Sequence, residues 1–164
     1  MYISDAGNEV DLKAEHINQY IRATSGEGFT AKNFRTWGAT YRCAERLAFL
    51  AEAQDAKSME KWVLEMPEVE SMEKLWTEGD WIPPNTETGR NKAMLAVIDT
   101  VAADLGNTRA VCRSSYIHPW FLDAWMGEYL LDKWKEFAGM RQLSGLSKGE
   151  SVTLRILKDL RNIA

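Results

Sequence analysis

The chain has 164 residues, the size of one domain that can bury a core, and 45% of them are hydrophobic. With 27% charged residues and 4 prolines, the composition is typical of a globular protein and argues against disorder. The net charge of −4 argues against a simple nucleic-acid binder, whose affinity depends on neutralising phosphates. No apolar run approaches the length of a membrane span, so we expect no membrane contact.

The acidic charge is concentrated in one segment. Residues 52–88 hold ten Asp and Glu against three Lys, so the rest of the chain carries 17 basic and 14 acidic residues. We therefore expect one domain over residues 1–164, with an acidic, Trp-rich insert at about 54–88. Outside the insert, the charge is compatible with a surface that faces DNA.

The first half of the chain indicates a short strand pair followed by helices. Residues 1–10 are typical of two strands joined by a turn, and residues 11–24 have the apolar spacing of a helix. Thr30 is the predicted cap of the next helix. Its apolar positions step by three and four along one stripe that we expect to be buried: Phe34, Trp37, Tyr41, Ala44 and Ala48. A basic stripe runs beside it, and by itself is typical of a solvated face: Lys32, Arg35, Arg42 and Arg46.

The second half indicates further helices. The insert predicts one or two short amphipathic helices, which either pack against the domain or form a partner-binding surface. Thr86 or Thr88 opens a helix that Gly106 ends, and Pro119 starts another. A polar helix follows around Trp134, and a capping box at residues 147–150 precedes the last helix.

Two boxes carry the chemistry. TAKNFRTWGAT covers residues 30–40, and LGNTRAVCRSSYIHP covers residues 105–119. The second box places the amide of Asn107 nine residues ahead of Tyr116, with Arg109 and Arg113 between them. A tyrosine that attacks a phosphodiester needs cationic or hydrogen-bonding groups on the non-bridging oxygens, because the transition state spreads negative charge over them. This run supplies such groups.

Together the two boxes resemble the C-terminal part of the catalytic domain of type IB DNA topoisomerases, in the bacterial and poxvirus-type branch. On this resemblance, Arg35 matches the second catalytic arginine and Lys32 the lysine three residues before it. Asn107 matches the phosphate-contacting His or Asn, and Tyr116 matches the nucleophile. Arg109 stands where the family usually has proline, which is a departure from the pattern.

The resemblance implies a mainly helical, multi-helix catalytic domain with a short β-ribbon at its N-terminus. It also implies that Tyr116 cleaves one DNA strand through a 3′-phosphotyrosyl bond and reseals it, which relaxes supercoiled DNA without ATP, metal or other cofactor. Arg35 and Asn107 would bind the non-bridging oxygens. Duplex DNA would be the partner of four basic residues: Lys32, Arg42, Arg109 and Arg113.

The family uses two further groups, an arginine and a lysine that protonates the leaving 5′ oxygen. Both lie ahead of the first box by more residues than this chain has. We therefore expect a C-terminal part that needs an N-terminal topoisomerase half as its partner. Because Cys43 and Cys112 have neither metal-ligand nor framework spacing, we expect a reducing compartment, the cytoplasm, with the protein at the nucleoid.

Two alternatives remain. A tyrosine recombinase shares this chemistry, but its second-arginine box reads HxxR, and here Lys32 stands in the histidine position. The other alternative is a non-catalytic helical protein, either a DNA-binding remnant or an interaction module built around the Trp-rich insert.

Overall fold

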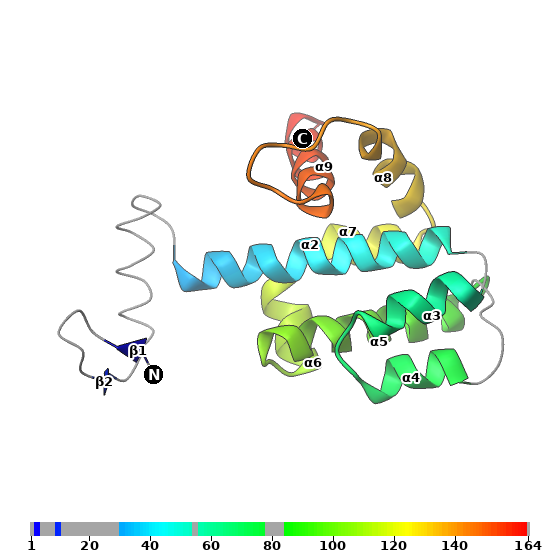
Figure 1. The fold of residues 1–164 in the computed structure, drawn as a ribbon. Coiled ribbons are helices and arrows are strands. Elements are labelled where there is room, and N and C mark those ends of the chain that lie inside the picture. Colours follow the sequence, from blue (N-terminus) through cyan, green and yellow to red (C-terminus); the bar gives the residue numbers. More distant parts are fainter. Residues whose placement is uncertain (1, 4–8, 11–29, 54–55, 78–83, 164) are drawn as a thin grey trace.

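The computed structural model describes residues 2–3, 9–10, 30–53, 56–77 and 84–163. These residues are mainly helical, which confirms the fold class expected from the sequence (Figure 1). None of the described helices is both long and apolar enough to cross a membrane.

A short antiparallel ribbon lies near the N-terminus. It consists of β1 (Tyr2–Ile3) and β2 (Glu9–Val10), with Tyr2 opposite Val10 and Ile3 opposite Glu9. The ribbon expected in residues 1–10 is therefore present. The helix expected over residues 11–24 lies outside the described residues.

Helix α2 (Ala31–Glu52) runs across the molecule and contacts most of the helices that follow it (Figure 1). Thr30 caps it as predicted: the Asn33 N–H donates to Thr30 Oγ1 at 3.3 Å, and the Thr30 N–H donates to Asn33 Oδ1 at 2.9 Å. This reciprocal capping box fixes where the helix begins.

The predicted buried stripe of α2 is wrong at its first member. Phe34 is 49% exposed, because burial on this helix starts one turn later, at Gly38. Ala44 and Ala48 are buried as expected, whereas Trp37 and Tyr41 are half-buried. The apolar face of α2 therefore packs mainly through its second half.

The insert forms two helices, α3 (Ala56–Leu64) and α4 (Glu70–Thr77), on the same side of α2 as α5 (Figure 1). Its methionines are buried in the common core: Met59, Met66 and Met72. The Trp62 ring stacks on Phe49 of α2, with 4.8 Å between the ring centroids. The described part of the insert thus follows the packing alternative.

Helix α5 (Glu87–Leu105) is the second central element and lies beside α2 and α4. Thr86 caps it, accepting a 3.0 Å hydrogen bond from the Gly89 N–H. Its core face is buried at Met94, Val97, Ile98 and Val101, while Leu105 at its end is half-buried. The three short elements that follow are α6 (Arg109–Val111), the π-helix η1 (Cys112–Tyr116) and α7 (Pro119–Met126).

The last two helices, α8 (Leu130–Ala138) and α9 (Lys148–Ile163), pack together on the opposite side of α2 from α3 and α4 (Figure 1). The predicted capping box at the start of α9 is present, with Ser147 Oγ accepting from the Glu150 N–H at 3.1 Å. Glu150 also accepts a 3.1 Å hydrogen bond from Trp37 Nε1, which ties α9 to α2.

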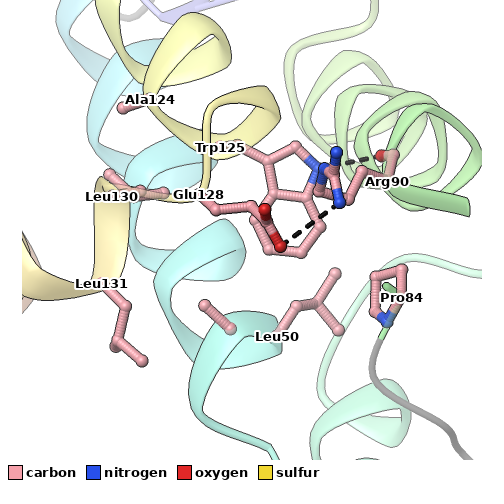
Figure 2. A pocket seen from close by; sticks show the side chains of 9 residues that line it. Leu50, Pro84, Arg90, Ala124, Trp125, Glu128, Leu130 and Leu131 are labelled. Atoms are coloured by element: carbon pink, nitrogen blue, oxygen red, sulfur yellow. Dashed lines mark hydrogen bonds and ion pairs between the residues drawn. The ribbon is translucent and has the colours of Figure 1, made fainter. Parts of the chain in front are cut away.

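A cavity of about 250 Å³ opens where α2, α5, α7 and α8 meet (Figure 2). Trp125 Nε1 donates to the Arg90 carbonyl oxygen at 2.8 Å, and Arg90 Nη1 lies 3.3 Å from Glu128 Oε1. Leu50 and Pro84 complete much of the wall. None of the site residues predicted from the sequence borders this cavity.

Candidate active site

Arg35 and Asn107 meet, although 72 positions separate them in the sequence. Arg35 Nη1 donates to Asn107 Oδ1 at 3.3 Å, and Arg35 Nη2 donates to the Leu105 carbonyl oxygen at 3.1 Å. Both acceptors are neutral oxygens. Among the described residues, Arg35 takes part in no ion pair with a carboxylate. Its side chain is exposed and its charge is available to an anion.

Asn107 is held in place by the end of α5. Gly106 adopts φ 68° and ψ 33°, the left-handed conformation that glycine accepts without a Cβ penalty. The Asn107 N–H then folds back to the Ala102 carbonyl oxygen at 2.8 Å, the six-to-one bond of a Schellman motif. Sequence analysis predicted this helix end, and the geometry confirms it.

The side-chain amide nitrogen of Asn107 carries two N–H donors that are unused in the described structure. Because Oδ1 accepts from Arg35, Nδ2 points another way; it is buried from solvent and has no hydrogen-bond acceptor in the described structure. An unpaired buried donor is unfavourable by about 1–3 kcal/mol. A phosphate oxygen can therefore accept the hydrogen bond that Asn107 Nδ2 lacks.

Tyr116 ends a helical turn of unusual geometry. Thr108 caps α6, accepting a hydrogen bond from the Val111 N–H at 3.3 Å, and the chain then widens into the π-helix η1. The Ile117 N–H donates to the Cys112 carbonyl oxygen at 3.0 Å, the i to i+5 bond of a π-helix. Such turns are rare and frequently occur at functional sites.

Thr40 of α2 anchors the backbone around Tyr116. Its hydroxyl donates to the Tyr116 carbonyl oxygen at 3.1 Å and accepts from the His118 N–H at 3.2 Å. Thr40 is 2% exposed, so this is a buried link between the two boxes. Sequence analysis missed it; the available signal was a polar residue at a core-facing position of a helix.

Tyr116 is half-buried and borders an open cavity of about 410 Å³ between α2, residues 114–119 and Leu157 of α9. The α2 residues that border the cavity recur every three to four positions: Asn33, Thr36, Trp37 and Thr40. That spacing makes one face of the helix, and Arg35 lies on another. The structure thus brings Arg35 and Asn107 together and places Tyr116 beside a different face of α2.

Cys112, the first residue of η1, is 0% exposed. Burial raises the pKa of its thiol to about 11. At the other end of the segment, His118 Nδ1 accepts from the Trp120 N–H at 3.2 Å and caps α7. Partial desolvation lowers the pKa of His118, in keeping with the neutral ring that this acceptor role requires.

The four predicted DNA-binding residues lie in different surroundings. Lys32 and Arg113 are exposed, on the first turn of α2 and on η1. Arg42 donates to the Gly38 carbonyl oxygen at 3.1 Å and covers the Tyr41 ring at 4.9 Å. Arg109 is bound by a carboxylate: its Nε and Nη2 lie 2.6 and 2.5 Å from the two oxygens of Asp99.

Comparison with known proteins identifies a family. No curated protein matches the chain. The family model described as eukaryotic DNA topoisomerase I, catalytic core, matches residues 5–124, well over half of the 164 residues. The match contains both boxes and thus Arg35, Asn107 and Tyr116. The chain belongs to the DNA topoisomerase I catalytic-core family.

Proposed function

We propose that this protein carries out the strand-cleavage chemistry of a type IB DNA topoisomerase, with Tyr116 as nucleophile and Arg35 and Asn107 as the phosphate-binding pair. The observation that carries the proposal is the hydrogen bond between Arg35 and Asn107, which joins the two boxes. The family match supports it, because members of a topoisomerase family act on DNA. The finer assignment to the bacterial and poxvirus-type branch rests on the resemblance of the two boxes.

In the proposed reaction, Tyr116 Oη forms a bond to the phosphorus of a DNA phosphodiester, and the bond from phosphorus to the 5′ oxygen breaks. The phenol loses its proton and the leaving 5′ oxygen gains one. The 3′-phosphotyrosyl bond preserves the phosphodiester bond energy, so the free 5′ hydroxyl can attack it and reseal the strand. Rotation of the cut strand between the two steps changes the DNA topology.

Arg35 and Asn107 have the chemistry for the non-bridging oxygens. In the free protein, Arg35 donates to two neutral carbonyl oxygens, and hydrogen bonds from a guanidinium to an anionic oxygen are about twice as strong as those between neutral groups. An incoming phosphate would therefore displace the Asn107 and Leu105 oxygens. Opening the pair also frees the Asn107 amide, whose Nδ2 has no acceptor in the described structure.

Cleavage requires Tyr116 to approach this pair from another face of α2. The π-helical turn of η1 offers a physical route, because such a turn contains one residue more than an α-helical turn. Its relaxation toward α-helix would rotate the residues at its end. We infer that DNA binding brings the Tyr116 ring from the cavity to the phosphate.

Covalent trapping on an end-labelled suicide duplex tests the nucleophile. Supplied with an N-terminal topoisomerase half, the wild-type protein should form an adduct and Tyr116→Phe should form none, while circular dichroism shows the same helix content for both. An adduct that persists in Tyr116→Phe would overturn the assignment. Relaxation of a supercoiled plasmid, as opposed to strand exchange between two duplexes, separates a topoisomerase from a recombinase. A wild-type protein that binds no DNA would favour the non-catalytic alternative.

The phosphate-binding pair is tested by rate. Arg35→Ala should lower the single-turnover cleavage rate by about 10²- to 10³-fold, the usual effect of removing a donor from a site where charge develops. Arg161→Ala, an exposed arginine on α9, is the matched control and should leave the rate unchanged. If Arg35→Ala weakened DNA binding but left cleavage unchanged, its transition-state role would be wrong. Adding an N-terminal topoisomerase half to the same assay tests the expected need for that partner, which stays a prediction.

A further inference from the structure

Three polar side chains form a continuous chain from the insert to the candidate site. Ser71 Oγ of α4 donates to Asp99 Oδ2 of α5 at 2.5 Å. The two Asp99 oxygens accept from Nε and Nη2 of Arg109, at the start of α6, at 2.6 and 2.5 Å. Three helices that the sequence separates are therefore joined by one carboxylate.

The position of Arg109 makes this chain relevant to Asn107. Arg109 is two residues after Asn107 and is the first residue of α6, while Asp99 lies on α5, whose end carries Asn107. The ion pair thus closes the turn that contains Asn107 by linking the helix before it to the helix after it. Asp99 is 19% exposed and Arg109 is 45% exposed, so the pair is partly shielded from water.

Arg109 is poorly suited to bind phosphate in this arrangement. The edge of its guanidinium formed by Nε and Nη2 faces both oxygens of one carboxylate, which cancels its charge and occupies the fork that would hold a phosphate. Asp99 is correspondingly stabilised as an anion: the hydrogen bonds from Arg109, together with that from Ser71, hold its pKa below the usual value despite some burial. Arg35 differs, because its acceptors are neutral.

We propose that Arg109 is a positioning residue: held by Asp99, to which Ser71 also donates, it fixes the start of α6 and thereby keeps Asn107 beside Arg35, so that the insert helix α4 supports the phosphate-binding pair. The proposal rests on the function proposed above. It replaces the expectation that Arg109 binds DNA directly.

The position of Arg109 at the start of α6 suggests proline as a variant that could replace its positioning role. The first position of a helix tolerates proline, because its N–H has no partner within the helix and the ring presets the helical φ. This chain has arginine where the family pattern has proline. Arg109→Pro should therefore restore by ring constraint the order that Arg109 provides through its ion pair, and Arg109→Ala should not.

The first test measures cleavage and DNA affinity separately. Arg109→Ala should slow single-turnover cleavage about 10- to 100-fold, as expected for a misplaced catalytic group, and change the Kd for duplex DNA less than twofold. Arg109→Pro should recover most of the rate. In an Asn107→Ala background, Arg109→Ala should add little, because both changes act on one group.

Other results would overturn the proposal. If Arg109→Ala raised the Kd for duplex DNA and made that Kd less dependent on salt concentration, Arg109 would be a phosphate contact. Additive effects of Arg109→Ala and Asn107→Ala would show that Arg109 does not act through Asn107. Arg161→Ala serves as the control in each assay.

The second test needs no catalysis. Hydrogen exchange of the free chain follows the amides of Asn107, Val111 and Cys112, each of which donates a hydrogen bond in this turn. Asp99→Asn and Arg109→Ala should speed the exchange of these amides about tenfold, and Ser71→Ala should speed it less. None of the three variants should change the exchange of the α9 amides. Unchanged exchange rates would contradict the proposed coupling of Arg109 to Asn107, even if the enzyme were active. A wild-type protein that cleaves no DNA even with an N-terminal topoisomerase half, combined with the expected exchange, would instead contradict the proposed function and leave the coupling supported.

Discussion

The hydroxyl of Thr40 lies between two backbone groups of the second box, 3.1 Å from the Tyr116 carbonyl oxygen and 3.2 Å from the His118 nitrogen. One buried side chain on α2 therefore fixes the backbone on both sides of Ile117. The tyrosine is positioned through its backbone, while its side chain borders the cavity.

Thr40→Val should lower the free energy of unfolding by about 1–3 kcal/mol, because the shape is kept but a carbonyl and an N–H lose their partner. Thr40→Ser keeps the hydroxyl and should cost only about 0.8 kcal/mol for the missing methyl group. Urea unfolding gives both values. If serine proved as destabilising as valine, packing of the methyl group and not the hydrogen bonds would hold the segment.

Gly106→Ala should destabilise the protein by about 1–2 kcal/mol, because residue 106 has φ 68° and an L-residue is strained there. No atom lies within 4 Å of an added Cβ, so the cost is conformational and not steric. Gly139→Ala is the matched control: it ends α8 at φ −81° with similar free space, and should be neutral or stabilising by about 0.4–1 kcal/mol. Equal losses in both variants would contradict the conformational explanation.

His118→Ala should lower the free energy of unfolding by about 0.5–2 kcal/mol, because the Trp120 N–H loses its cap. His118→Asn supplies another acceptor and should lose less. The pKa of His118 is depressed by burial, so the unfolded chain takes up a proton first as the pH falls below 6.5. Stability should therefore decline with falling pH in this window, and the decline should be weaker in His118→Asn.

Cys112 gives a second pH dependence of opposite direction. Burial raises the pKa of its thiol from 9.0 to about 11, so between these values the unfolded chain ionises while the folded chain does not. The free energy of unfolding should fall as pH rises through this window. Because tyrosines and lysines also titrate there, the measurement is the difference in slope between wild type and Cys112→Ala. Identical slopes would show that the thiol is not shielded.

Much of this fold was predictable because its helix boundaries are local. Thr30, Thr86 and Thr108 accept hydrogen bonds from amides three residues ahead, and Gly106 takes a backbone conformation that glycine accepts without strain. Such signals depend on a few neighbouring residues and survive in any tertiary context. The two boxes could be recognised from the sequence because each is a short segment with its own internal spacing.

Sequence analysis could not tell which element packs against each helix face. Phe34 continues an apolar stripe in the sequence, yet it is exposed because burial on α2 begins only at Gly38. Arg109 was expected to bind DNA, and no sequence signal indicated that Asp99 of α5 binds its guanidinium while Ser71 of α4 donates to the same carboxylate. Periodicity shows which residues share a face and not which partner covers that face.

The sequence by itself determined the helices, their caps and the two boxes, since hydrogen-bonding capacity and apolar spacing are properties of short segments. Only the tertiary structure decided that Arg35 reaches Asn107 across 72 positions, that Thr40 holds the backbone of Tyr116, and that the tyrosine lies beside another face of α2. These relations depend on how α2 packs against α5 and η1, because a few ångströms or a partial rotation of one helix changes which side chains meet.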